Sequence, residues 1–167
     1  MKKLALFAPT VALAAACSGS SVSMQPGQWE LTTRVTDFQA PGAPAQMLEQ
    51  MRTSAAQPQV TNECLTPEQA ANPGRWMTNP GGTSANCTFT DQTFAGGVIN
   101  ISSSCPLPNN GGSTHTTLQG TYTATTMEAR LSAQLQAGPG APPGMPRTIS
   151  TTGTLTARRT GDCPAGR

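Results

Sequence analysis

The sequence predicts a mainly β protein: a curved antiparallel meander of six to eight strands, forming a half-barrel or an open sandwich, with one short helix and two disulfides. Three observations predict it. Several segments alternate apolar and polar residues, tight Gly-containing turns separate neighbouring segments, and an even set of cysteines follows an export signal. The frequent Thr and Ser in these segments predict that one face of the sheet is solvated.

The N-terminus predicts export. Lys2 and Lys3 precede an apolar run, residues 4–16, that is short for a membrane span and ends in small residues. We expect residues 1–16 to be a signal peptide and Cys17, which directly follows the cleavage site, to carry the lipid anchor. Ordinary signal peptidase would cut at the same bond, so a soluble periplasmic protein is the alternative.

The residues after Cys17 predict a tether. Residues 17–25 form the lipidated cysteine and a flexible Ser/Gly-rich linker, and residues 26–167 form a single β-rich domain. Ser18 stands where many Gram-negative lipoproteins that stay at the inner membrane have aspartate. We therefore expect the periplasmic face of the outer membrane, with several acyl chains (palmitate among them) providing a firm anchor.

The first expected strand is Trp29–Val35, whose odd positions are mostly apolar, so Trp29 is expected in the core. Residues 45–53 are a second helix candidate, which would place Met47, Leu48 and Met51 on one side. Thr66-Pro67-Glu68-Gln69 predicts a short helix to Ala71, in which Thr66 caps the start and Gln69 completes a capping box.

The remaining strands are expected at residues 87–94, 98–105, 116–124, 127–135 and 149–157. Gly96-Gly97 joins the first two of them. Gly120 and Gly153 stand inside strands, where they would permit the sheet to curve.

When Cys17 is assigned to the lipid anchor, four cysteines remain: Cys64, Cys87, Cys105 and Cys163. In an oxidising compartment they predict two disulfides, and a zinc site is disfavoured because paired C-x-x-C motifs are absent. Three pairings are open. We favour Cys64 with Cys87 and Cys105 with Cys163, which would close the last strand onto the middle of the sheet.

The charge of the mature chain is balanced. Removal of the signal peptide removes both lysines, and the mature chain has eight arginines and eight acidic residues. Without a basic cluster, the sequence has no electrostatic footprint for nucleic acid, and we expect no such partner.

Several short motifs together resemble the bacterial envelope proteins of domain of unknown function 3617. They are Met24-Gln25-Pro26-Gly27-Gln28-Trp29-Glu30, Cys64-Leu65-Thr66-Pro67-Glu68, the separated Cys87 and Cys105, and Gly161-Asp162-Cys163. The resemblance covers nearly the whole mature chain. It implies a small, β-rich exported protein, often a lipoprotein, with no assigned activity. Many relatives carry methionine-rich Met-Pro-Gly stretches that this chain lacks.

Candidate catalytic groups are few. His115 is the single histidine and is expected to be an exposed strand residue, and the acidic residues are scattered without a visible pair. Met47, Met51 and Met145 are too loosely spaced to predict a copper(I) site. We expect no enzyme activity, no metal and no cofactor.

The sequence thus favours a non-catalytic envelope lipoprotein, anchored to the membrane by lipid, that serves as a structural or protein-interaction module. The alternative is a carrier for a lipid or another apolar ligand. Its ligand-facing residues would be Trp76, which could instead close one end of the sheet, together with Leu118, Tyr122, Leu131 and Leu135. A carrier predicts a void on the concave face, whereas an interaction module predicts that the same face is filled.

Overall fold

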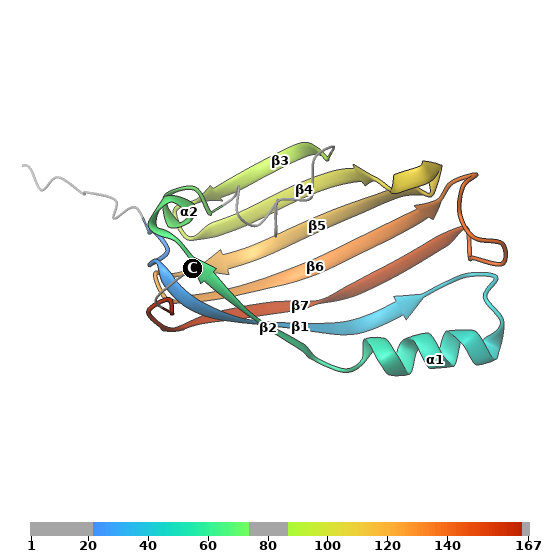
Figure 1. Cartoon of the computed structure of the whole chain (residues 1–167), viewed down its shortest axis with the longest axis horizontal. Coiled ribbons are helices and arrows are strands. Elements are labelled where there is room, and N and C mark those ends of the chain that lie inside the picture. Colours follow the sequence, from blue (N-terminus) through green and yellow to red (C-terminus); the bar gives the residue numbers. More distant parts are fainter. Residues whose placement is uncertain (1–21, 74–86, 165–167) are drawn as a thin grey trace, which may run out of the picture.

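The structure is a computed structural model that describes residues 22–73 and 87–164 (Figure 1). Within these ranges the chain forms seven strands, two α-helices and one turn of 3-10 helix. In chain order the elements are β1 (Gly27–Gln39), α1 (Ala45–Ala55), β2 (Gln59–Leu65), α2 (Pro67–Ala71), β3 (Thr88–Ala95), β4 (Val98–Pro106), η2 (Pro108–Asn110), β5 (Gly112–Tyr122), β6 (Thr126–Ala137) and β7 (Thr148–Gly161).

The seven strands form one antiparallel sheet in the order β2-β1-β7-β6-β5-β4-β3. Strands β3 to β7 are consecutive neighbours, as a meander requires. β1 pairs with the other side of β7, and β2 pairs with β1 at one edge. The mainly β class, the antiparallel pairing and the number of strands are confirmed, but only the last five strands form the meander.

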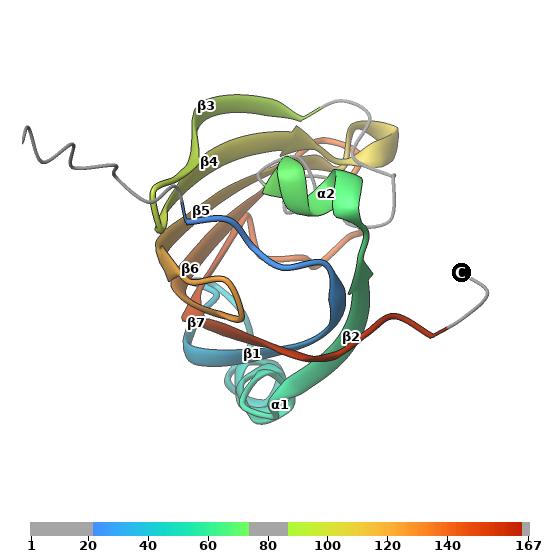
Figure 2. The ribbon, with the colours of Figure 1, turned by 90° about the vertical axis from the view of Figure 1, so that its left-hand side faces the viewer.

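The sheet curls into an open half-barrel, in which the edge strands β2 and β3 face each other across the interior (Figure 2). Two strand glycines allow neighbouring strands to approach closely. A Cβ on Gly120 would overlap the Glu128 carbonyl oxygen and Ala129, and one on Gly153 would overlap the Arg34 carbonyl oxygen. The two positions predicted to permit curvature are therefore sites where any side chain would push strands apart.

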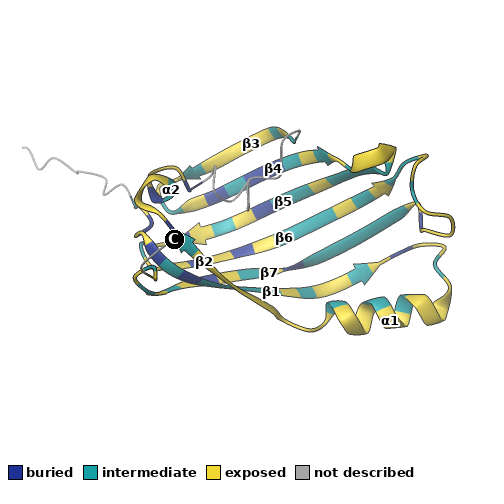
Figure 3. Ribbon diagram, viewed as in Figure 1, coloured by how far each residue is buried: buried dark blue, intermediate teal, exposed yellow. Residues whose placement is uncertain are grey.

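One end of the half-barrel holds the core. We define the core end by the turns at residues 96–97 and 123–125, and the far end by residues 107–111 and 138–147. Figure 3 shows the buried residues gathered toward the core end, whereas the strands are half-buried or exposed toward the far end. The core cluster contains Met24, Trp29, Leu65, Ala70, Ile99, Ile101, Leu118, Tyr122, Met127, Ala129 and Ala157.

The segment before β1 belongs to this core. The Gln25 amide donates to the Ala124 carbonyl oxygen at 2.8 Å, the Tyr122 hydroxyl donates to the Val22 carbonyl oxygen at 3.1 Å, and Met24 is only 3% exposed. Residues 22–25, which the sequence assigned to the tether, therefore contact the folded domain.

α2 begins as predicted. The Gln69 amide donates to the Thr66 hydroxyl at 3.2 Å, and the Thr66 amide donates to the Gln69 side-chain oxygen at 2.8 Å, which completes the capping box. Ala70 faces the core and is buried. α2 thus covers the core end between the two edges of the sheet (Figure 2).

α1 extends two residues beyond the predicted end at Thr53, and none of its residues is buried. β2 pairs with β1 only over Gly27–Thr33, so the later part of β1 has no strand on this side. α1 packs there instead, and the Arg52 Nε donates to the Phe38 carbonyl oxygen at 3.3 Å. The helix therefore protects a length of strand edge from pairing with another chain.

β2 was not predicted. Gln59 to Glu63 are all exposed and only Leu65 is buried, so this strand has almost no apolar alternation. Its pairing with β1, in which Gly27 lies opposite Leu65 and Thr33 opposite Gln59, accounts for its extended conformation. Edge strands with two wet faces give no period-two signal in the sequence.

The favoured disulfide pairing was wrong. The bridges are Cys64–Cys163 and Cys87–Cys105. Cys64 lies near the end of β2 at the core end, whereas Cys87 precedes β3 at the far end and on the opposite edge, so these two thiols cannot meet. Cys87 is instead adjacent to Cys105 across the β3–β4 pair, with Cα atoms 4.1 Å apart.

Candidate functional site

Three of the four described side chains predicted to face a ligand lie together on the concave face. Leu118 is opposite Leu131 across the β5–β6 pair, and Tyr122 is opposite Met127. Leu118 and Tyr122 are 6% and 5% exposed, and Leu131 packs against the same core cluster. Because these residues fill the space between the strands, this part of the face is packed core.

Tyr122 is further fixed by its neighbours. Its ring centroid lies 4.4 Å from that of Phe94 on β3, and its hydroxyl donates to the Val22 carbonyl oxygen. A buried tyrosine needs such a partner for its hydroxyl, and the N-terminal segment supplies it. Tyr122 therefore joins the N-terminal segment to the sheet.

Leu135 lies apart from the other three. It is on β6 toward the far end, opposite Thr114 of β5 and Ile149 of β7, and it is half-buried and outside the core cluster. Leu135 and Ile149 thus form an apolar cross-strand pair on the concave face beyond the packed core.

Neither of two surface pockets formed by described residues is lined by these four side chains. One, of about 280 Å³, lies between Val35–Phe38 of β1 and, on the other side, Arg52 and Ala55 of α1 with Ala56, which follows the helix. The other, of about 460 Å³, lies within the loop that joins β6 to β7. Trp76 and Cys17, the other predicted site residues, lie outside the described residues.

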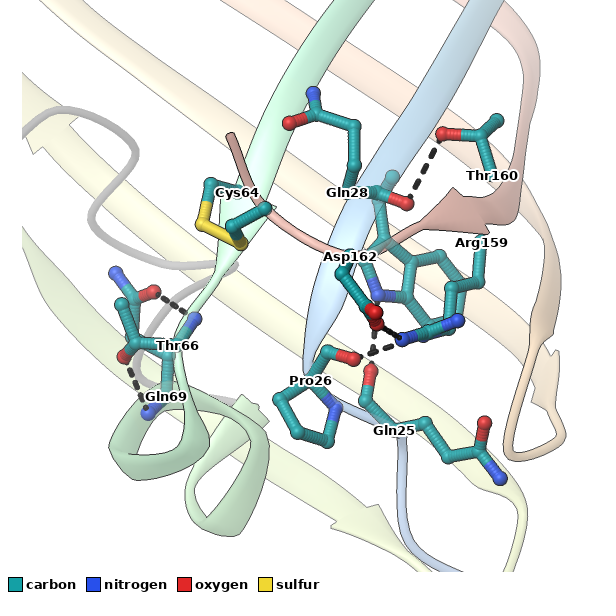
Figure 4. Close-up of a disulfide and its surroundings, with 11 residues drawn as sticks. Gln25, Pro26, Gln28, Cys64, Thr66, Gln69, Arg159, Thr160 and Asp162 are labelled. Atoms are coloured by element: carbon teal, nitrogen blue, oxygen red, sulfur yellow. Dashed lines mark hydrogen bonds and ion pairs between the residues drawn. A yellow bond between two sulfur atoms is a disulfide. The ribbon is translucent and has the colours of Figure 1, made fainter. Parts of the chain in front are cut away.

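The core end brings together the motifs at the two ends of the chain (Figure 4). Gln28 lies opposite Cys64 on one side and opposite Gly161 on the other, and the Cys64–Cys163 bridge spans the same place. The three motifs that begin at Met24, Cys64 and Gly161 are therefore neighbours in space. They build one structural junction between the first two strands and the last.

Arg159 is the central polar side chain of this junction. Its Nε donates to the Pro26 carbonyl oxygen at 2.8 Å, and its guanidinium pairs with Asp162. Beside it, the Trp29 indole nitrogen donates to the Gln25 carbonyl oxygen at 3.0 Å, and the Trp29 side chain is fully buried, as predicted. These bonds hold the segment before β1 against β7 (Figure 4).

Gly27 makes this close contact possible. Its φ is +140°, and a Cβ at this position would overlap the Gly161 carbonyl oxygen and the Arg159 side chain. Only a residue without a side chain fits both the conformation and the space. The glycine of the first motif is thus required by its contact with the last strand.

Arg159 was not among the predicted site residues, although its place in the alternating pattern of the last strand is a signal for it. The predicted inward positions of the last strand run through Leu155 and Ala157, and the next position in that phase is Arg159. A charged residue at an inward position is expected only where it finds partners, which here are the Pro26 carbonyl and Asp162.

Among the described residues, the ion pairs do not include His115. His115 is exposed on β5, opposite Ser104 and Gln134. Glu30 pairs with Arg158 on the outer face at 2.9 Å. In residues 22–73 and 87–164, no three His, Cys, Asp or Glu side chains are grouped as metal ligands.

None of the helices that the structure describes is long and apolar enough to cross a membrane. Comparison with curated proteins and comparison with solved structures both found no match. A family model described as "Protein of unknown function (DUF3617)" matches residues 24–163, which include every motif of the junction at the core end. The chain therefore belongs to the DUF3617 family.

Proposed function

We propose that this protein is a non-catalytic lipoprotein of the Gram-negative envelope, held by Cys17 at the periplasmic face of the outer membrane, and that it serves as a structural or protein-interaction module. The export signal and the position of Cys17 directly after it support the proposed location and lipid anchor. The family match is consistent with this proposal but assigns no activity.

The filled concave face is the observation that carries the proposed role. Leu118 and Tyr122 are buried within the core cluster and Leu131 is partly buried against it, so most of their apolar surface is already covered by the protein itself. Burial of this surface contributes to folding and is unavailable to a ligand. This arrangement supports a rigid module over a carrier that binds at these residues.

The anchor is tested by substitution of its cysteine. We expect Cys17→Ser to move the protein from the membrane fraction to the soluble periplasm, because the substitution removes the thiol that would carry the acyl chains. Ser18→Ala is the matched control and should stay with the membrane. If Cys17→Ser partitions with the membrane as strongly as the control does, the lipoprotein proposal is wrong.

A carrier is the second candidate, because the Leu135–Ile149 pair lies on the concave face outside the packed core. Native mass spectrometry of the mature domain, purified from the periplasm without its anchor and followed by organic extraction, distinguishes the two roles. We expect a single mass with the four-hydrogen loss of two disulfides. A discrete co-purifying lipid or small molecule would instead support the carrier.

A further inference from the structure

The start of the folded chain lies at the core end, which limits how the molecule can sit on a membrane. Val22 is held there by the Tyr122 hydroxyl, and its side chain lies beside Gly97 of the turn between β3 and β4. Cys17 precedes Val22 by five residues. Five residues reach at most about 18 Å when fully extended.

This reach is short compared with the sheet. β7 has 14 residues, which corresponds to about 46 Å of strand. An anchor at Cys17 therefore keeps the core end near the lipid headgroups, and it leaves the far end free to point away from the membrane or to lie along it.

The surface at the core end favours contact with lipid. In the turn Ala95-Gly96-Gly97-Val98 there is no charged side chain, and Val98 is 49% exposed. The neighbouring turn between β5 and β6 is also uncharged. Its Thr123 hydroxyl bonds with the Thr126 hydroxyl at 2.7 Å and accepts the amides of Thr125 and Thr126, so these polar groups have partners within the turn.

The broad outer face of the sheet is less suitable for the same contact. Its exposed positions include Arg34, Gln119, Glu128, Arg130 and Arg158, which carry charged or amide groups that prefer water. A molecule that lay flat on this face would bring these groups to the bilayer. An upright molecule that rests on the β3–β4 side of the core end brings the uncharged turns instead, because the exposed Glu68 of α2 and Asp162, which follows β7, lie elsewhere on this end.

We propose that the β3–β4 turn, Ala95–Val98, is a membrane-contacting surface that rests on the lipid headgroup region and holds the half-barrel upright, with its far end directed away from the bilayer. This inference rests on the proposed anchor at Cys17. The turn needs little affinity of its own, because a short tether makes its contact with the bilayer intramolecular. The occupant of this surface is the lipid bilayer itself.

Tryptophan reporters on vesicles test the orientation. The lipidated chain is reconstituted in vesicles of phosphatidylethanolamine and phosphatidylglycerol, with and without brominated acyl chains, which quench nearby indoles. Val98→Trp reports the core end. Met145→Trp, at a far-end position that is 40% exposed, is the matched control. The unsubstituted chain gives the emission of the two native tryptophans, which is subtracted from both variants.

We expect brominated lipid to reduce the added emission of Val98→Trp and to leave that of Met145→Trp unchanged. Equal loss for both reporters would mean that the molecule lies along the membrane, and no loss for Val98→Trp would mean that the turn stands clear of it. Either result overturns the orientation.

A chemical anchor at Cys17 tests the orientation of the molecule independently of its proposed natural lipidation. In a chain that starts at Cys17 and lacks natural lipid, Cys17 is the single cysteine outside the two bridges, so its thiol can be coupled to a maleimide phospholipid. The mass of the cell-derived protein shows whether Cys17 is lipidated. The chemically anchored chain gives the same quenching comparison whatever that mass shows.

Discussion

Arg159 shows how one side chain connects the two ends of this chain. Its side chain is 23% exposed, and it bonds to the Pro26 carbonyl oxygen and to Asp162. The adjacent Arg158 points to the outer face, is 66% exposed and pairs with Glu30. Two neighbouring arginines on one strand therefore have different environments, which allows a matched comparison.

We expect Arg159→Ala to lower the free energy of unfolding by about 1–3 kcal/mol, because it leaves the Pro26 carbonyl without its charged donor. Arg158→Ala removes only an exposed ion pair and should cost about 0–1 kcal/mol. Urea unfolding of both variants measures the difference. Equal costs would show that the bond to Pro26 contributes nothing to the junction.

At the scale of elements, β2 is an edge strand that is held largely by its disulfide. Five of its seven residues are exposed, and it has only β1 as a neighbour. Cys64–Cys163 crosses β1 and ties β2 to the residues after β7. β3, the other edge strand, is tied directly to its neighbour β4 by Cys87–Cys105. Each edge of the half-barrel thus has one covalent link.

We expect Cys64→Ala/Cys163→Ala to cost more stability than Cys87→Ala/Cys105→Ala, because the bridged residues are 99 and 18 positions apart. In the chain-entropy model, a disulfide that closes a loop of about 100 residues stabilises the fold by about 4.7 kcal/mol, and one that closes a loop of about 15 residues by roughly 3 kcal/mol. Hydrogen exchange should show faster exchange of the amides in β2 in the first variant and of those in β3 in the second. The reverse stability order, or unchanged exchange in β2, would contradict this assignment.

These elements also show how far sequence reasoning reaches. α2 was predictable because Thr66 and Gln69 cap it locally, and β1 and β4 to β7 show period-two patterns. β2 was not predictable because Gln59 to Glu63 are all exposed and, unlike β3 with its Gly96-Gly97 turn, it is not joined to a neighbouring strand by a tight turn. The disulfide pairing depends on where β2 lies, so it could not be deduced either.

For the candidate site, the face on which the side chains lie was predictable, but the filling of that face was not. Period two placed Leu118, Tyr122 and Leu131 on one face, which the register confirms. Whether that face is filled depends on the segment at Val22–Gln25, which contacts the core end and was assigned to the tether. A contact between residues 100 positions apart leaves no local signal at either position.

At the scale of the whole molecule, the half-barrel has two unlike ends. The core end combines the start of the folded chain, one disulfide, α2 and the packed core. The far end consists of turns and a Pro- and Gly-rich loop, with half-buried strands beneath it (Figure 3). With an anchor at Cys17, a partner in the periplasm would meet the far end first.

The position of β1 between β2 and β7 has a consequence for biogenesis. In the export that we propose, the N-terminus leads, so β1 would reach the periplasm first and β7 last, yet β1 pairs with β7 along nearly its whole length. Until β7 arrives, β1 has only β2 as a partner, and a two-stranded ribbon is marginally stable in water. In that proposed export, β1 would be the first strand to leave the translocation channel, and one of its sides would stay unpaired until β7, the last strand, arrives.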